Sequence, residues 1–183
     1  MRRTAPLLIA LALCACDDDE KPALPSAAPP TPTGLLVADR AVPAPHILAI
    51  GTEGESSWRI SVSTDPLDCE TLAAAYPERP ETKGKLFDFW LTQPLESDGQ
   101  KGLWTFRSGY WTDAKGGRGL TSRGAELDSV SIDDSHVAIV GLEISCQDSR
   151  AATAEASLIG YHGDLRAERC PRVERSEADP RQT

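Results

Sequence analysis

The amino-acid sequence predicts a mainly β domain: an antiparallel β-sandwich or an open barrel of about seven strands, with one short helix and a disordered Pro-rich linker before it. Several runs alternate apolar and polar residues with a period of two, which is typical of strands that bury one face. Clusters of Gly, Asp and Ser separate these runs and favour tight turns. A single stretch has the start and stop signals of a helix, so layers of helices are not expected.

The alternating runs predict strands at four places, and in most of them the apolar members point to one face. These runs are residues 57–64, 86–91, 130–133 and 136–145. With the remaining short runs, about seven strands are expected in the folded part. The last run contains Val137, Ile139, Val140, Leu142 and Ile144.

The one predicted helix follows the first of these strands. Asp65 can cap a turn that begins at Pro66, and Asp68 lies three residues further on, as in a helix with an acidic first turn. The helical stretch continues to Tyr76 and ends there, because Pro77 cannot continue a helix.

The amino-terminal residues have the three-part layout of a secretory signal peptide. Residues 1–4 include two Arg, residues 5–13 are mostly apolar, and small residues follow. The longest apolar run, residues 5–15, is interrupted by Pro6 and is shorter than the roughly 18 to 20 residues that a membrane-spanning helix needs. The sequence therefore predicts an export signal and no membrane-spanning helix.

The end of this segment contains two cysteines. The sequence Leu13-Cys14-Ala15-Cys16 resembles the lipobox of bacterial lipoproteins, with Leu three positions and a small residue one position before the cysteine. The resemblance implies that residues 1–15 are a signal peptide and that Cys16 is the lipid-attached first residue of the mature chain. In the weaker alternative frame, which ends at Cys14, Leu13 takes the position where a small residue is expected.

The lipobox resemblance also implies a place in the cell. Two or three acyl chains on one cysteine, at about 0.8 kcal/mol per buried CH2 group, hold a protein at a membrane stably. We therefore expect the chain to be lipid-anchored in the bacterial cell envelope, with its folded domain in the periplasm or at the cell surface. The choice between the inner and the outer membrane stays open.

A linker is predicted between the anchor and the domain. Seven of the 14 prolines lie in residues 17–45, and proline restricts φ and lacks an N–H donor. Residues 16–45 are therefore expected to be disordered and extended. Residues 171–183 are rich in charged and poor in apolar side chains, which predicts a disordered tail. These boundaries leave residues 46–170 as the β domain.

Three cysteines remain after the lipidated one: Cys69, Cys146 and Cys170. An exported domain favours a disulfide. We favour Cys69 with Cys170, because Cys69 opens the helical connector and Cys170 ends the last strand, where geometry is adjustable. Pairing of Cys146 with Cys170 is the alternative.

Charge excludes one class of partner. The chain has 19 Lys and Arg against 28 Asp and Glu, a formal net charge of -9, and its basic residues form no stripe. A surface that follows nucleic-acid phosphates needs concentrated positive charge. The sequence therefore predicts no nucleic-acid partner.

The sequence has few residues that indicate catalysis. Asp133, Asp134 and His136 are its nearest approach to a cluster of metal-ligating side chains, and they suggest, as one hypothesis, a small envelope hydrolase or a metal-dependent enzyme. That hypothesis requires them to converge with a further ligand such as His162. The alternative interpretation is a polar turn between two strands. No local nucleophile or phosphate-binding motif is present, so no catalytic residue, metal or cofactor is predicted.

The aromatic residues are unevenly distributed, since nine of the ten lie between positions 58 and 111. Most are expected in the core. Trp90, Tyr110 and Trp111 are the candidates for ligand contact, because flat aromatic faces stack on sugar rings and anchor protein interfaces. The favoured hypothesis is a non-enzymatic binding or structural module for an envelope protein or a glycan. It requires these three side chains to form one exposed patch.

Replacement of the lipid-attachment cysteine tests the predicted anchor. We expect Cys16→Ser to remove the thioether linkage, so that the protein is released in soluble form or accumulates as an uncleaved precursor. Intact mass and detergent partitioning of the mature protein measure this outcome. A Cys14→Ser variant is the matched control and should still be acylated. Acylated, membrane-bound C16S protein would contradict the prediction.

Overall fold

The computed structural model describes residues 32–51, 56–76, 78–151, 153 and 158–171, except for the side chain of Ser108. Cys16, the predicted signal peptide and most of the predicted tail lie outside these residues. No helix in the described part of the chain is long and apolar enough to cross a membrane.

Ten strands and one helix make up the described residues, and all ten strands belong to one sheet. The elements are β1 (Gly34–Val37), β2 (Arg40–Val42), β3 (His46–Gly51), β4 (Ser57–Ser63), α1 (Cys69–Ala75), β5 (Leu86–Thr92), β6 (Thr105–Asp113), β7 (Gly116–Glu126), β8 (Ser129–Ile132), β9 (His136–Gln147) and β10 (Leu158–Cys170).

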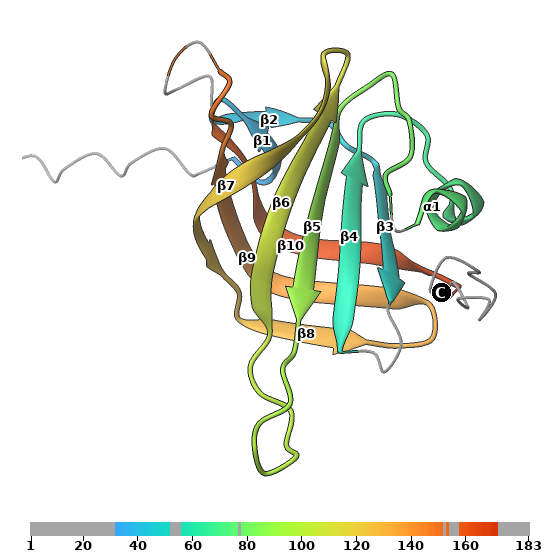
Figure 1. Ribbon diagram of the computed structural model, residues 1–183, viewed down its shortest axis with the longest axis vertical. Helices are drawn as coiled ribbons and strands as arrows, with labels where there is room; N and C mark the ends of the chain where they lie inside the picture. The colour runs from blue at the N-terminus through green and yellow to red at the C-terminus, as the bar shows by residue number, and fades with distance from the viewer. Residues whose placement is uncertain (1–31, 52–55, 77, 152, 154–157, 172–183) are drawn as a thin grey trace, which may run out of the picture. The chain divides into compact units, whose positions relative to one another are not determined.

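The sheet curves back on itself because β10, which lies beside β3 near one end of the strand order, also pairs with β9 near the other end. The strand order is β2-β1-β10-β3-β4-β5-β6-β7-β9-β8, and β10 also pairs with β9. The pairings therefore close a circuit of seven strands, from β3 through β7 to β9, β10 and back to β3. Figure 1 shows β4, β5 and β6 in one layer that crosses β8, β9 and β10 behind it. The prediction of a mainly antiparallel β fold with one short helix is confirmed.

The folded part begins earlier than the predicted boundary at His46. β1 pairs antiparallel with β10, and β2 pairs with β1, within the segment for which a linker was expected. The physical reason is local: the apolar run of β1 lies between Pro32 and Pro43 rather than being interrupted by them. Leu35 is buried in the main core, so this short hairpin contributes to the fold.

The interior between the two layers is filled with large apolar side chains. Trp58, Phe87, Phe89 and Trp111 are among the largest fully buried residues. Burial of each such side chain stabilises the fold by about 1.5 to 3 kcal/mol. Most of the aromatic residues in the middle of the sequence therefore lie in or against the main core of the sheet, as expected.

A bulge in β9 changes which residues of that strand face the core. Val137 and Ile139 are buried, Val140 is 46% exposed, and Leu142 is buried again. The pairing of β9 with β10 shifts register at this point, where Gly141 has a φ of +63°. The extra residue on β9 explains why the apolar pattern of this run changes phase.

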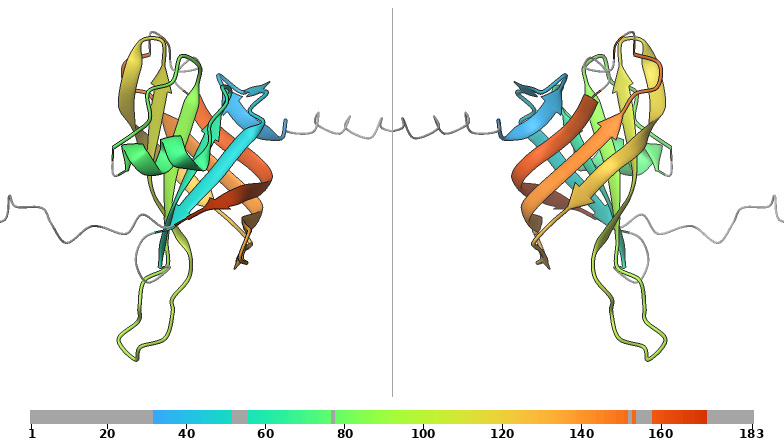
Figure 2. Two further views of the ribbon diagram at one scale, coloured as in Figure 1. Left: turned by 90° about the vertical axis from the view of Figure 1, so that its right-hand side faces the viewer. Right: turned by 90° about the vertical axis from the view of Figure 1, so that its left-hand side faces the viewer.

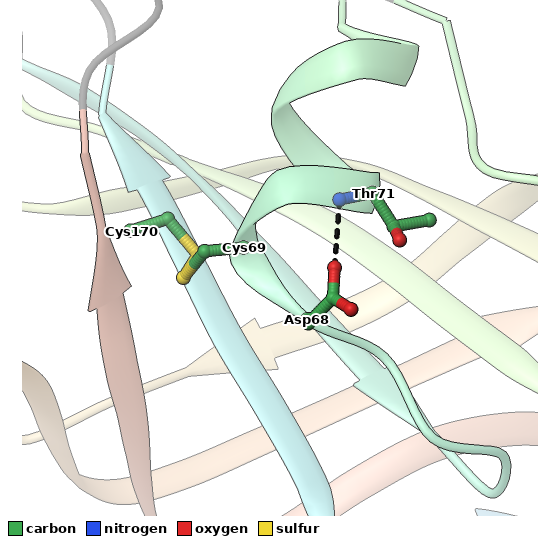
Figure 3. Close-up of a disulfide and its surroundings, with 4 residues drawn as sticks. All are labelled: Asp68, Cys69, Thr71 and Cys170. Atoms are coloured by element: carbon green, nitrogen blue, oxygen red, sulfur yellow. Dashed lines mark hydrogen bonds between the residues drawn. A yellow bond between two sulfur atoms is a disulfide. The ribbon is translucent and has the colours of Figure 1, made fainter.

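The helix α1 packs on the outer face of the sheet, where a second and smaller core forms. This second core contains Leu48, Ile50, Leu67, Leu72, Leu86 and Cys170. The helix starts later than predicted: Asp68 is the N-cap and accepts a hydrogen bond from the Thr71 N–H at 2.8 Å (Figure 3). Asp65 does not cap it, because its carboxylate accepts the Gly84 N–H at 2.6 Å instead.

The favoured disulfide is confirmed, since Cys69 and Cys170 are bonded (Figure 3). The bond joins the first residue of α1 to the last residue of β10, 101 positions apart. Cys146 is a buried free thiol in the main core. Burial raises the pKa of the Cys146 thiol to about 12, so it stays protonated and unreactive at neutral pH.

Loss of the disulfide should lower stability. A loop of this length predicts a loss of about 2 to 5 kcal/mol in the free energy of unfolding on removal. We expect the double variant Cys69→Ala/Cys170→Ala to unfold at lower urea concentration and to be insensitive to reductant. The matched control is Cys146→Ala, which should keep the sensitivity to reductant. Equal midpoints for reduced and oxidised wild-type protein would contradict this.

Candidate functional site

The candidate site lies on the surface, because apolar side chains fill the space enclosed by the curved sheet. Two surface hollows are the most informative. One, of about 460 Å³, is lined on β7, β9 and β10 by residues that include Arg123, Glu143, Ser145 and His162. The other, of about 700 Å³, lies between the start of β6 and the end of β7.

The three aromatic residues predicted to contact a ligand do not form one exposed patch. Trp111 is 2% exposed and lies in the core. Adjacent residues of a strand point to opposite faces, so Tyr110 lies on the outer face when Trp111 lies inside. Trp90 is half-buried beside Tyr76, with ring centroids 6.2 Å apart. The guanidinium of Arg79 covers the Tyr110 ring at 3.4 Å from its centroid.

A buried ion pair occupies the outer face of β4 and β5. Arg59 donates from Nη2 to Asp88 Oδ2 at 2.9 Å and from Nε to Oδ1 at 3.2 Å. The two side chains are only 1% and 2% exposed. Ser61 Oγ also donates to Asp88, at 2.5 Å. The strand alternation predicted polar residues on this face but not their burial.

The connector between α1 and β5 buries this pair. Arg59 Nη1 donates to the backbone carbonyl of Glu78 at 2.6 Å, and Arg79 Nε lies 3.6 Å from Asp88 Oδ2. The pKa of Arg79 is lowered from its ordinary value, mainly by burial of the guanidinium. The Asp88 carboxylate opposes this shift, and the positive charge of Arg59 adds to it. Two guanidinium groups thus share one carboxylate, and the cluster holds the connector on the sheet.

The residues of the enzyme hypothesis do not converge. His136 pairs with Glu168 in the register of β9 and β10, whereas His162, six residues earlier on β10, pairs with Glu143. The His162 Nε2 atom lies 3.0 Å from Glu143 Oε1. Asp134 makes no hydrogen bond that the structure shows to either histidine. Among the described residues, no group of three or more His, Cys, Asp or Glu could hold a metal ion.

The turn around Asp133 is structural. Its Oδ1 accepts hydrogen bonds from the Ser135 N–H at 2.7 Å, the Ser135 hydroxyl at 2.9 Å and the His136 N–H at 2.7 Å. The bonds from Ser135 and His136 lower the pKa of Asp133 to about 2. His136 Nδ1 also lies 3.1 Å from Arg166 Nη2. Ser135 Oγ lies 2.8 Å from His136 Nδ1, so Asp133, Ser135 and His136 form one local hydrogen-bonded turn.

A second charged cluster braces the β6–β7 hairpin. Arg118 donates to Asp113 at 3.0 Å and to Asp148 at 2.5 Å. The hydrogen bond from Arg118 is the largest cause of the lowered pKa of Asp113. Trp111 Nε1 donates to the same carboxylate at 2.9 Å. All these charges are paired with one another, so the cluster does not present a free group to a ligand.

The sequence analysis missed a projecting loop. Residues 93–104, here called the arm, connect β5 to β6 and extend beyond the ends of the strands in each view (Figures 1 and 2). The arm carries Leu95 and Leu103, which are 69% and 84% exposed and are the two most exposed large hydrophobic residues described. In the sequence, two leucines on either side of a polar turn at Asp98 could have indicated this loop.

The arm is held in shape by its own hydrogen bonds. The Glu96 N–H donates to the Gln100 carbonyl at 2.7 Å, and the Gly102 N–H donates to the Pro94 carbonyl at 2.8 Å. The side-chain amide of Gln93 donates to the Gly102 carbonyl at 3.0 Å. The leucines are therefore displayed on a formed hairpin.

The chain was compared with known protein families, curated proteins and solved structures. No protein-family model, curated protein or solved structure matches the chain.

Removal of the buried carboxylate should destabilise the fold. Asp88→Leu leaves Arg59 buried without its counter-ion, and breaking a buried ion pair costs about 3 to 5 kcal/mol. We expect the double variant Arg59→Met/Asp88→Leu to recover part of that loss. Urea unfolding measures both variants, with Glu81→Leu as an exposed control. A D88L variant as stable as the control would show that the pair does not hold the connector.

Proposed function

We propose that this protein is a non-enzymatic binding module of the bacterial cell envelope, anchored by a lipid on Cys16, whose ligand is another protein. The lipobox-type sequence supports the anchor. The Cys69–Cys170 disulfide is in keeping with a domain outside the cytosol, where disulfides persist. The exposed leucines of the arm are the observation that carries the binding role.

The described residues favour binding over catalysis. Asp133 and His136 are in contact, but His162 lies apart from them and contacts Glu143, and the other charged clusters are internally paired. The thiol of Cys146 is buried and protonated. A catalytic site brings its nucleophile, base and orienting groups together beside one pocket, whereas His162 and His136 line two different surface hollows.

A protein ligand is favoured over a glycan. Sugar rings stack on flat, exposed aromatic faces. Here Arg79 covers the ring of Tyr110, and Trp90 lies against Tyr76. The exposed apolar surface is instead aliphatic, on Leu95 and Leu103. Aliphatic side chains on a projecting hairpin are suited to insertion into a pocket of another protein.

Photo-crosslinking in the native cell envelope tests this function. We would place p-benzoylphenylalanine at Ser97 on the arm and, as a control, at Glu81 on the connector, since both positions are exposed. We expect a discrete protein adduct from position 97 alone. Leu95→Ser/Leu103→Ser should lower its yield about tenfold, because buried apolar anchors dominate interface energies.

The stability of the variants provides the control for this experiment. Both leucines are exposed, so their replacement should change the free energy of unfolding by less than about 0.5 kcal/mol. Adducts of the same mass and yield from both positions, or an adduct that the double serine variant leaves unchanged, would overturn the role of the arm.

A further inference from the structure

We propose that the cleft between β6 and β7 binds an extended, lysine- or arginine-bearing segment of the protein partner as an added strand. This proposal rests on the proposed function and specifies the chemistry of the ligand. The cleft is defined by the start of β6 and the end of β7, and it begins where the arm ends, at Trp104.

The pairing between the two strands ends halfway along them. β6 and β7 pair from Asp113 and Gly116 at the hairpin to Gly109 and Leu120. Beyond that point β7 pairs with β9 through residues 121–126, and β6 pairs only with β5. Figure 1 shows β7 diverging from β6. Residues 105–108 and 121–126 therefore face the cleft with strand edges that have no partner strand among the described residues.

Unpaired strand edges are the usual docking site for an extended peptide. The backbone N–H and C=O groups of such an edge bond those of the incoming strand, and pockets for alternate side chains add specificity. The hollow between the edges has a volume of about 700 Å³ and is lined by Trp104, Phe106 and Leu127. It therefore offers both backbone partners and apolar contacts to a bound strand.

The charges around the cleft select a basic segment. Glu126, Asp128 and Glu143 line it, and none of its described lining residues is basic. Glu126 and Glu143 are directly opposite each other in the β7–β9 register, a like-charge arrangement that destabilises a sheet. Lysine or arginine side chains of a ligand would relieve this repulsion and could also approach the face of Trp104.

A nearby histidine contacts one carboxylate of the cleft. His162 Nε2 lies 3.0 Å from Glu143 Oε1, and Glu126 and Glu143 also line the neighbouring hollow that contains Arg123 and His162, whereas Asp128 lines the cleft and not that hollow. Arg107 on β6 is exposed but is not among the lining residues. The described residues hold no metal-binding group, so the carboxylates do not form a site for a single ion. An extended basic polypeptide satisfies the edges, the apolar lining and the charges together.

The probe is a peptide of about six residues, a typical strand length, that alternates Lys and Val. Two matched control peptides are used. One alternates Glu and Val, and the other has the Lys-Val sequence with alternate backbone nitrogens methylated, which removes their hydrogen-bond donors. Titration of the whole mature protein, followed by amide chemical shifts and hydrogen exchange, measures binding. We expect the Lys-Val peptide alone to bind and to protect residues 105–108 and 121–126.

Two triple variants, each of which removes three negative charges, distinguish the effect of the cleft carboxylates on peptide binding from the effect of the overall charge of the protein. Glu126→Gln/Asp128→Asn/Glu143→Gln should weaken peptide binding about tenfold. The control Glu70→Gln/Glu78→Gln/Glu81→Gln changes exposed carboxylates on α1 and the connector, and it should leave the affinity within about twofold of wild type.

The outcomes distinguish this inference from the proposed function. Equal binding of the N-methylated peptide, absence of protection at the two strand edges, or equal losses in the two triple variants would overturn strand addition in the cleft. The adduct from Ser97 on the arm would then still stand. Conversely, edge protection by the Lys-Val peptide without an arm adduct would support the cleft and overturn the role of the arm.

Discussion

The fold depends on strand β10, because its pairing with both β9 and β3 closes the circuit of strands. One edge pairs antiparallel with β9 over most of its length, and the other pairs first with β1 and then, in parallel, with β3. This closure encloses the aromatic core between the layers. The Cys69–Cys170 bond holds the end of β10 to α1, so the strand that closes the circuit is itself tied to the element packed outside it.

The opening between β6 and β7 follows from the same closure. β7 pairs with β6 near the hairpin and must then leave it to reach β9, which continues the circuit towards β10. The first residues of β6 are left without a partner on that side, and the arm projects from the same place in the chain (Figure 2). Apolar surface, open strand edges and three carboxylates therefore occur together at one end of the sheet. The proposed binding site is a consequence of how the circuit of strands closes.

The outer face of β4 and β5 shows why polar alternation does not define solvent exposure. Arg59 and Asp88 occupy positions that alternate with core residues, as in a strand with one wet face. The connector after α1 covers them, and their burial is tolerated because each charge has its partner within hydrogen-bonding distance. Arg79 of the same connector covers the ring of the half-buried Tyr110, and Trp111 lies in the core, so an aromatic patch did not form. The connector thus leaves the arm as the main exposed apolar feature of the described residues.

By itself the sequence determined the mainly β class, the single short helix and the aromatic core, and it favoured the pairing of Cys69 with Cys170, which the structure then decided. These features follow from the period of apolar residues, from turn residues and from the positions of cysteines at element ends, all of which are local. The anchor at Cys16 remains a prediction from sequence. Only the tertiary structure decided that β1 joins the sheet, that Trp111 is buried and that β6 and β7 separate. Local alternation shows that a strand has two faces and two edges, but contacts between residues far apart in the chain determine what covers them.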